Sequence, residues 1–302
     1  MSLAPSAPLA ARRFSLADEP PTLVPGVALD LFGAPARRLD TVQLSAGTRR
    51  ADGAGPMGYA ERSFVPRPPW RMPDDDEWAA LTESDEGLDP PGDRIAVFAV
   101  PASLLEPFAQ LRALCYEADN LKRLRAVSDD VVGRTALLEA ARYARSLTRP
   151  ERSDLEGPGL HANVPPGTPT MTTGHDRQLT GLHVDSWYRR GIEGRASSPN
   201  RISVNLGVHD RHLLYLNLPL RMIAARVAEA RGGAAVEDIS FALPREFMRF
   251  FPDYPVVKLT VAPGEAYIAP TENIVHDGYQ ERSGGIDLQF TCRGHFRAPA
   301  RR

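Results

Sequence analysis

Cysteine is almost missing from this chain of 302 residues, which contains only two. Cys115 and Cys292 lie far apart and outside any C-x-x-C motif, so the sequence predicts neither a disulfide framework nor a zinc ribbon. We expect both thiols to pack as small hydrophobic groups. The scarcity of cysteine fits a reducing compartment, and the cytoplasm is the predicted location.

An excess of charge of either sign is also missing, because 36 basic residues stand against 38 acidic ones. The basic residues are scattered singly or in pairs, so we expect neither nucleic acid nor an anionic membrane as a partner. No apolar run reaches the roughly 18 to 20 residues of a membrane helix. The twin arginine at 12–13 is followed by an acidic, proline-rich stretch, which argues against an export signal. A small-molecule partner remains the expectation.

Three common catalytic motifs are absent as well: the G-x-S-x-G elbow, the P-loop and G-x-G-x-x-G. Hydrolase, NTPase and dinucleotide-binding functions therefore have no support in the sequence. The chain is long enough for one substantial core, so we expect one overall domain.

That domain divides into three segments by composition. Residues 1–92 are rich in proline and glycine and show no sustained periodicity, which predicts an extended arm that packs in pieces or stays partly disordered. Residues 93–157 contain an apolar strand at 94–100 and two helices, at 103–127 and, capped by Ser128, at 129–147. These helices are expected to pack together on the core. Residues 158–302 are predicted to form the catalytic core.

Short apolar or alternating segments dominate that third part. The predicted strands are 160–164, 180–187, 201–208, 212–218, 255–261, 265–271 and 286–294. A helix is expected at 220–230, and the "VAPGEAY" stretch at 261–267 predicts a tight hairpin turn. Many short strands with few helices between them favour a mainly β fold with flanking helices, built as a double-sheet, cupin-like jelly roll.

A histidine and an aspartate stand two positions apart in "TGLHVDSW" at 180–187. In a strand, residues i and i+2 face the same way, so His183 and Asp185 are expected to project side by side. His276 follows at the end of a later apolar segment, where a strand of the same jelly roll would run beside the first. Two histidines and one carboxylate occupy one face of an octahedral metal and leave three positions open, which suits non-haem Fe(II). The alternative is a buried polar network without a metal.

The dyad His183-x-Asp185, the distant His276 and the strand "IDLQFTCRG" with Arg293 resemble the Fe(II)/2-oxoglutarate-dependent dioxygenase superfamily. The resemblance covers roughly residues 158–298. It implies a double-stranded β-helix fold and a metal bound by His183, Asp185 and His276. It also implies that an Arg or Lys on the strand after the second histidine holds the distal carboxylate of 2-oxoglutarate, often with a Ser or Thr nearby.

Arg293 is the first candidate for that anchor, although its seventeen-residue distance from His276 exceeds the commonest spacing. Thr291 shares its strand face, and an arginine fork suits bidentate carboxylate binding. Arg282 is the second candidate, in a stretch that reads as an exposed loop. For Arg293, the alternative is a salt bridge or a solvated strand end.

Two more residues are candidates for contacts at the site. Asn205 lies in the middle of a predicted core strand and either bonds the cosubstrate or satisfies neighbouring backbone. Trp187 follows Asp185 by two residues and either contacts substrate or packs as core or lid. His209 and His212 have a spacing that would suit a metal on a helix, but their stretch reads as a turn between strands, where the two side chains would diverge. His161, His175 and His295 lack a carboxylate at a matching offset and are expected on loops or the surface.

The implied activity is oxidation of a C–H bond, with O₂ and 2-oxoglutarate as cosubstrates and succinate and CO₂ as products. Asp185 occupies the position that halogenating relatives leave vacant, so hydroxylation or a related C–H oxidation is favoured. The expected substrate is small, an amino acid or a natural-product intermediate, because "WYRR" at 187–190 and "GR" at 194–195 could meet a carboxylate. Two alternatives stay open: a cupin-type metalloenzyme that does not use 2-oxoglutarate, and a non-catalytic jelly roll that binds a ligand.

Overall fold

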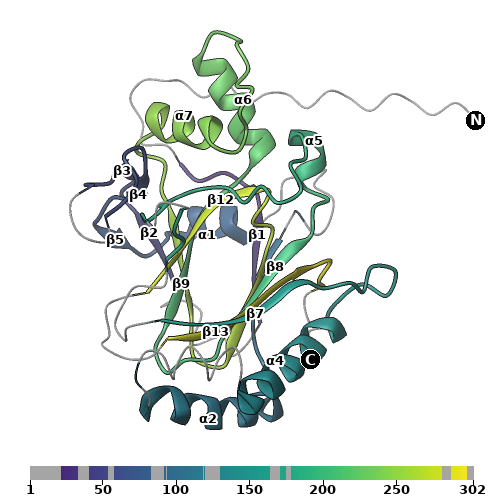
Figure 1. The fold of residues 1–302 in the computed structure, drawn as a ribbon. Helices are drawn as coiled ribbons and strands as arrows, with labels where there is room; N and C mark the ends of the chain where they lie inside the picture. Colours follow the sequence, from purple (N-terminus) through teal and green to yellow (C-terminus); the bar gives the residue numbers. More distant parts are fainter. Residues whose placement is uncertain are drawn as a thin grey trace, which may run out of the picture.

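The fold is mainly β with flanking helices (Figure 1). The computed structural model describes residues 22–32, 41–53, 58–82, 92, 94–117, 119, 130–163, 171–174, 178–280 and 287–297. The larger sheet has six strands in the order β1 (Ala28–Leu31), β6 (Arg94–Ala99), β11 (Glu265–Ala269), β8 (Asn200–Asn205), β13 (Leu288–Gly294) and β7 (Glu156–Ala162). Its neighbours are antiparallel except β1 and β6, which are parallel.

The second sheet has five antiparallel strands. Their order is β12 (Ile274–Tyr279), β9 (Arg211–Pro219), β10 (Val257–Val261), β2 (Val42–Ser45) and β5 (Trp70–Arg71). A separate hairpin pairs β3 (Thr48–Arg50) with β4 (Phe64–Pro66). From β8 to β13 the chain passes repeatedly between the two larger sheets, so residues distant in sequence meet between them.

Helices lie at both ends of this β framework (Figure 1). At one end are α2 (Ala102–Glu117) and α4 (Val131–Ser146), and at the other are α6 (Leu220–Ala230) and α7 (Ala242–Phe250). Two shorter helices are α1 (Asp75–Thr82) and α5 (Ile192–Arg195). No helix in the described ranges has the length and apolar character needed to cross a membrane.

The alternation of side chains along β6 explains how the layers are held together. Ile95 and Val97 join a hydrophobic cluster that also contains Leu44 and Leu259 of the five-stranded sheet. Ala96 and Phe98, pointing the other way, join a second cluster with buried residues of α2 and α4. A strand buried on both faces reads as a continuous apolar run, which is what the sequence at 94–100 shows. Buried residues of α2 and α4 share this second cluster with the six-stranded sheet.

On β8 and β13, only one of the two faces is apolar. Ile202, Val204, Phe290 and Cys292 belong to the cluster with α2 and α4. Because side chains alternate, Arg201 and Arg293 point to the opposite side, towards the five-stranded sheet. The six-stranded sheet therefore has an inner face that is apolar near β1 and β6 and polar near β8 and β13.

The N-terminal segment 1–92 contributes more regular structure than an extended arm. Its described parts supply β1 to the larger sheet and β2 and β5 to the smaller one. The "DDDE" stretch begins α1 with a capping box, in which Asp74 Oδ1 accepts from the Glu77 N–H and Glu77 Oε2 accepts from the Asp74 N–H. Strands of two to four residues in a proline-rich context are too short for their alternation to be recognised in the sequence.

Three local predictions differ from the structure. The turn at 261–267 is tight, since Glu265 N–H donates to Ala262 O, but it connects strands of different sheets and is not a hairpin. The segment 180–187 forms a single β-bridge at His183 instead of a strand. The described cap of α4 is Asp130, whose side chain accepts from Val132 N–H, while Ser128 lies outside the described residues.

Candidate metal centre

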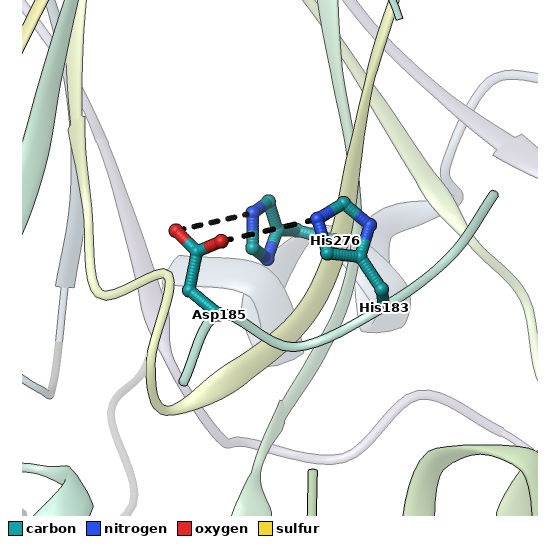
Figure 2. Close-up of side chains that lie close together, drawn as sticks. All are labelled: His183, Asp185 and His276. Carbon is teal, nitrogen blue, oxygen red and sulfur yellow. Dashed lines mark ion pairs between the residues drawn. The ribbon is translucent and has the colours of Figure 1, made fainter. Parts of the chain in front are cut away.

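His183, Asp185 and His276 converge between the two sheets (Figure 2). One ligand atom from each lies within 4.8 Å of the other two. His183 Nε2 is 3.9 Å from Asp185 Oδ1, and His276 Nε2 is 4.0 Å from Asp185 Oδ2. The predicted convergence of these three side chains is confirmed.

Backbone pairing explains why two histidines 93 positions apart come together. The His183 N–H donates to His276 O at 2.9 Å, and the His276 N–H donates to His183 O at 2.7 Å. His276 lies in β12, so this bridge places the segment at 180–187 along the free edge of that strand. Directly bridged residues put their side chains on the same side, and the two imidazole centroids are 4.7 Å apart.

Both imidazoles direct Nε2 towards Asp185. His183 Nδ1 is 2.7 Å from Gly181 O and His276 Nδ1 is 3.3 Å from Ile274 O. Because a carbonyl oxygen only accepts, each Nδ1 carries the proton and each Nε2 keeps its lone pair. This is the tautomer that a metal requires when it binds through Nε2.

Gly181 brings the His183 segment close to the β3–β4 hairpin. Its φ is +70°, and a Cβ at this position would lie 2.5 Å from Phe64 O. The next residue, Leu182, donates its N–H to the same oxygen at 2.9 Å. A side chain at 181 would therefore push the histidine segment away from β4.

The backbone of Asp185 is fixed from two sides. Its N–H donates to Thr271 O at 3.1 Å, and its carbonyl accepts from Arg195 Nη1 at 2.7 Å. Arg195 also pairs with Glu272 at 3.3 Å, and both of these side chains are 1% exposed. Glu272 Oε1 in turn accepts from the N–H groups of Trp187 and Tyr188. This buried ion pair connects the segment that carries Asp185 to the β11–β12 connection.

Two arginines approach the Asp185 carboxylate from the six-stranded sheet. Arg201 Nη2 donates to Asp185 Oδ2 at 2.9 Å, whereas Arg293 Nη2 stays 3.8 Å from the same oxygen. The two arginines are direct register partners on β8 and β13. The Arg293 guanidinium stacks on the Trp187 ring, with its Cζ 4.0 Å from the ring centroid.

The protonation states suit metal ligation at neutral pH. Burial favours a raised pKa for Asp185, but Arg201 above all, with the two imidazoles, outweighs burial and lowers that pKa to about 2. Burial, together with the neighbouring His183, lowers the pKa of His276 to about 3, and burial also lowers the pKa of His183. A carboxylate and two neutral imidazoles are the forms that bind a divalent cation.

An unpartnered atom indicates that the triad fits a metal ion. His276 Nε2 is buried and has no hydrogen-bond partner among the described residues. A buried nitrogen lone pair without a hydrogen-bond donor costs free energy. The neighbouring imidazole Nε2 and carboxylate carry no proton to donate to it. A divalent cation would bind this lone pair and satisfy it. The residues present therefore fit the facial two-histidine, one-carboxylate set.

The other predicted site residues have different surroundings. Thr291 Oγ1 is 3.2 Å from His161 Nε2, on the same inner face as Arg293. The Asn205 side chain donates to His209 O and Val261 O. Of its two predicted roles, these contacts fit the bonding of neighbouring backbone. Trp187 is 64% exposed and lies at the rim of the site, not in the core. Arg282 and His175 lie outside the described residues.

Two arginines of the "WYRR" and "GR" stretches are already engaged by the protein. Arg195 is buried in the ion pair with Glu272, and Arg190 donates to the backbone and hydroxyl oxygens of Ser197. They do not offer the free cations on which the prediction of a carboxylate substrate depended.

Sequence reasoning missed three residues that hold the site: Arg195, Glu272 and Arg201. Arg201 had a usable signal, because in "RISVNLG" the period of two places it on the face of Asn205, which was recognised as polar. Glu272 had none, since it looks like an ordinary surface residue until the chain folds around it. Arg195 was expected to meet a substrate carboxylate, and no local pattern indicates its structural role.

His212 does not belong to the metal centre, although it is half-buried. Its Nδ1 is 3.2 Å from Thr260 Oγ1, and burial, with Lys258 and Arg211, lowers its pKa to about 4. Because the unfolded chain binds this proton near pH 6.5 and the folded chain does not, stability is lost as pH falls from about 6.5 to 4, at up to about 1.4 kcal/mol per pH unit. His212→Gln should flatten this slope in urea unfolding at pH 4.5, 5.5 and 7.5. An unchanged slope would contradict the assignment.

Known proteins give little additional information. No protein-family model matches the chain, and no curated protein does. Two solved structures, titled "Non-heme monooxygenase, ThoJ-Ni complex" and "non-heme monooxygenase; ThoJ apo", are similar to 66% of this chain over 71% of theirs, with 13% and 14% identity and a TM-score of 0.32 in each case. A TM-score this low does not establish a shared fold.

Proposed function

We propose that this protein is a non-haem Fe(II) oxygenase that uses 2-oxoglutarate and O₂ to oxidise a C–H bond of a small molecule. The observation that carries the proposal is the buried, unpartnered Nε2 of His276, which faces Asp185 beside the second imidazole of His183. Three ligands on one side of a metal leave positions for a chelating cosubstrate and for O₂.

The architecture supports a double-stranded β-helix. Among strands β8 to β13, β8, β11 and β13 lie in the larger sheet and β9, β10 and β12 in the smaller one, and all of their pairings are antiparallel, as in a double-sheet jelly roll. His183 pairs with β12 at the edge of the smaller sheet. In this arrangement all three ligands come from one side of the space between the sheets.

Arg293 supports the use of a dicarboxylate cosubstrate. Its side chain is 13% exposed, and its Nε is buried without a hydrogen-bond partner in the described part of the chain. A guanidinium carries five N–H donors in a fixed fork, and the 3.8 Å ion pair with Asp185 leaves the Arg293 donors available to a second anion. Trp187 stacks on it and holds its plane in place. We assign the distal carboxylate of 2-oxoglutarate to Arg293, with Thr291 on the same face as a further hydrogen-bonding group.

Bound Fe(II) would supply the redox chemistry that couples decarboxylation of 2-oxoglutarate to substrate oxidation. In the balanced reaction, 2-oxoglutarate, O₂ and R–H give succinate, CO₂ and R–OH. The chain's own residues hold the metal through His183, Asp185 and His276 and orient the cosubstrate through Arg293. The buried Arg195–Glu272 pair keeps the Asp185 segment in place while ligands exchange.

Anaerobic addition of Fe(II) and 2-oxoglutarate to metal-free protein tests this proposal. We expect a weak visible charge-transfer band and, after O₂ is admitted, succinate release. Tight iron binding without the band or succinate would contradict the use of 2-oxoglutarate and favour a metalloenzyme of the cupin type. Failure to bind iron would contradict the metal centre itself.

Arg293→Gln is expected to raise the cosubstrate Kd at least about tenfold, because it removes charge-assisted hydrogen bonds worth about 1.5 to 3 kcal/mol. The Kd of Arg293→Lys should lie between those of the wild type and Arg293→Gln, because lysine keeps the charge but loses the guanidinium fork. The measurement is a 2-oxoglutarate titration of the anaerobic Fe(II) protein. Arg249→Gln, at a side chain 64% exposed, is the matched control and should leave Kd unchanged. An unchanged Kd in Arg293→Gln would show that Arg293 is not the anchor.

A further inference from the structure

The inner face of the six-stranded sheet carries more positive charge beside the metal centre than one cosubstrate requires. Arg201 and Arg293 are direct register partners, so their side chains leave the sheet next to each other on the same face. Both reach the same oxygen of Asp185, at 2.9 Å and 3.8 Å. Their side chains are 23% and 13% exposed, so solvent screens their mutual repulsion only in part.

The neighbouring acids do not balance this pair. Glu272 is occupied by Arg195 and by two backbone N–H groups. Glu156 accepts from the Tyr188 hydroxyl. Among the described residues, Asp185 is therefore the one carboxylate that forms an ion pair with either arginine.

The positive potential extends along the inner face. Besides burial, Arg201 and Arg211 lower the pKa of His161 on β7, and Arg201 lowers the pKa of Arg293. Partly buried like charges in this arrangement are stabilised when an anion binds between them. The two guanidinium groups with a divalent metal carry four positive charges, whereas Asp185 and a dianionic cosubstrate bring three negative ones. One further negative charge would balance the site.

We propose that Arg201 binds a carboxylate of the organic substrate, which makes the substrate an organic acid, including N-acylated or free amino acids. This inference rests on the proposed function, in which Arg293 is reserved for the cosubstrate. Arg201 donates a single hydrogen bond to the described chain, to Asp185 Oδ2, so its other N–H groups are available to a ligand. Its contact with a metal ligand places a bound carboxylate directly beside the reacting centre.

The test compares two matched ligand sets, N-acetyl-L-amino acids and the corresponding N-acetyl-L-amino acid amides. Binding is followed by saturation-transfer NMR on protein loaded with Zn(II) and N-oxalylglycine, a non-reactive analogue of the cosubstrate. Succinate release is measured in parallel with Fe(II) and 2-oxoglutarate. We expect binding and stimulated turnover from acids only, with at least tenfold discrimination against the amides.

Arg201→Gln should remove this discrimination, and Arg249→Gln should change neither the discrimination nor the 2-oxoglutarate Kd. Binding by amides alone, or by neither set, would overturn the proposal. So would a variant pair with exchanged effects, in which Arg201→Gln weakens the cosubstrate and Arg293→Gln alters acid selection. Failure of the proposed function is distinguishable, because it abolishes the charge-transfer band of the wild type before any substrate is added.

Discussion

Arg195→Met is expected to lower the free energy of unfolding by about 3 to 5 kcal/mol. Arg195 is buried and donates to Asp185 O, Arg190 O, Ser186 Oγ and Ser240 Oγ, besides its ion pair with Glu272. Its removal leaves the Glu272 carboxylate buried without its counter-charge. Urea unfolding of the metal-free protein measures the loss.

The double variant Arg195→Met/Glu272→Gln identifies the cause. The introduced glutamine would keep an acceptor for the N–H groups of Trp187 and Tyr188 but carry no charge, so the double variant should be more stable than Arg195→Met alone. Arg249→Met, at an exposed side chain, should change stability by no more than about 0.5 kcal/mol. A loss below about 1 kcal/mol in Arg195→Met would mean that this ion pair does not hold the Asp185 segment.

His276→Leu is expected to abolish metal-induced stabilisation and to lower turnover at least about a thousandfold. In wild type, Fe(II) at 100 times its Kd should add about 2.7 kcal/mol to the free energy of unfolding. The variant removes one of three ligands, and the introduced leucine fills a similar volume. Because His276 Nε2 has no partner in the described chain, the metal-free variant should be nearly as stable as the metal-free wild type.

Thermal unfolding with and without Fe(II), under anaerobic conditions, checks this expectation. His209→Leu is the control, because that imidazole does not belong to the triad, and it should retain the metal-induced shift. A His276→Leu protein that is strongly destabilised without metal would indicate a structural histidine instead of a ligand.

The elements that the sequence could predict are those with an unambiguous period. The helix at 220–230 has the predicted bounds, and the apolar run at 94–100 is β6 within one residue. The triad was also predictable, because a local dyad and one distant histidine followed by a strand are enough to suggest a ligand set. Both thiols were expected to pack as small hydrophobic groups, and Cys115 and Cys292 belong to the cluster between α2, α4 and the larger sheet.

The remaining features depend on contacts that no local pattern encodes. The proline-rich N-terminal segment forms strands because it completes the edges of both sheets, a tertiary effect. His183 lies in an irregular segment with one bridge, and its position is set by Gly181 against Phe64 and by pairing with His276. Arg195 holds the Asp185 backbone in place, although the two residues are 10 positions apart in sequence. Its ion-pair partner Glu272 is 77 positions away, so no local pattern joins the three residues.

Titration with Mn(II), followed by the electron paramagnetic resonance signal of the free ion, tests the central claim most directly. At pH 7 the wild-type protein should remove one Mn(II) per chain from solution. Asp185→Asn, which keeps the shape of the side chain and removes its charge, should remove none at the same concentrations. Equal uptake by both proteins would show that the ion binds elsewhere and that His183, Asp185 and His276 form a polar cluster without a metal.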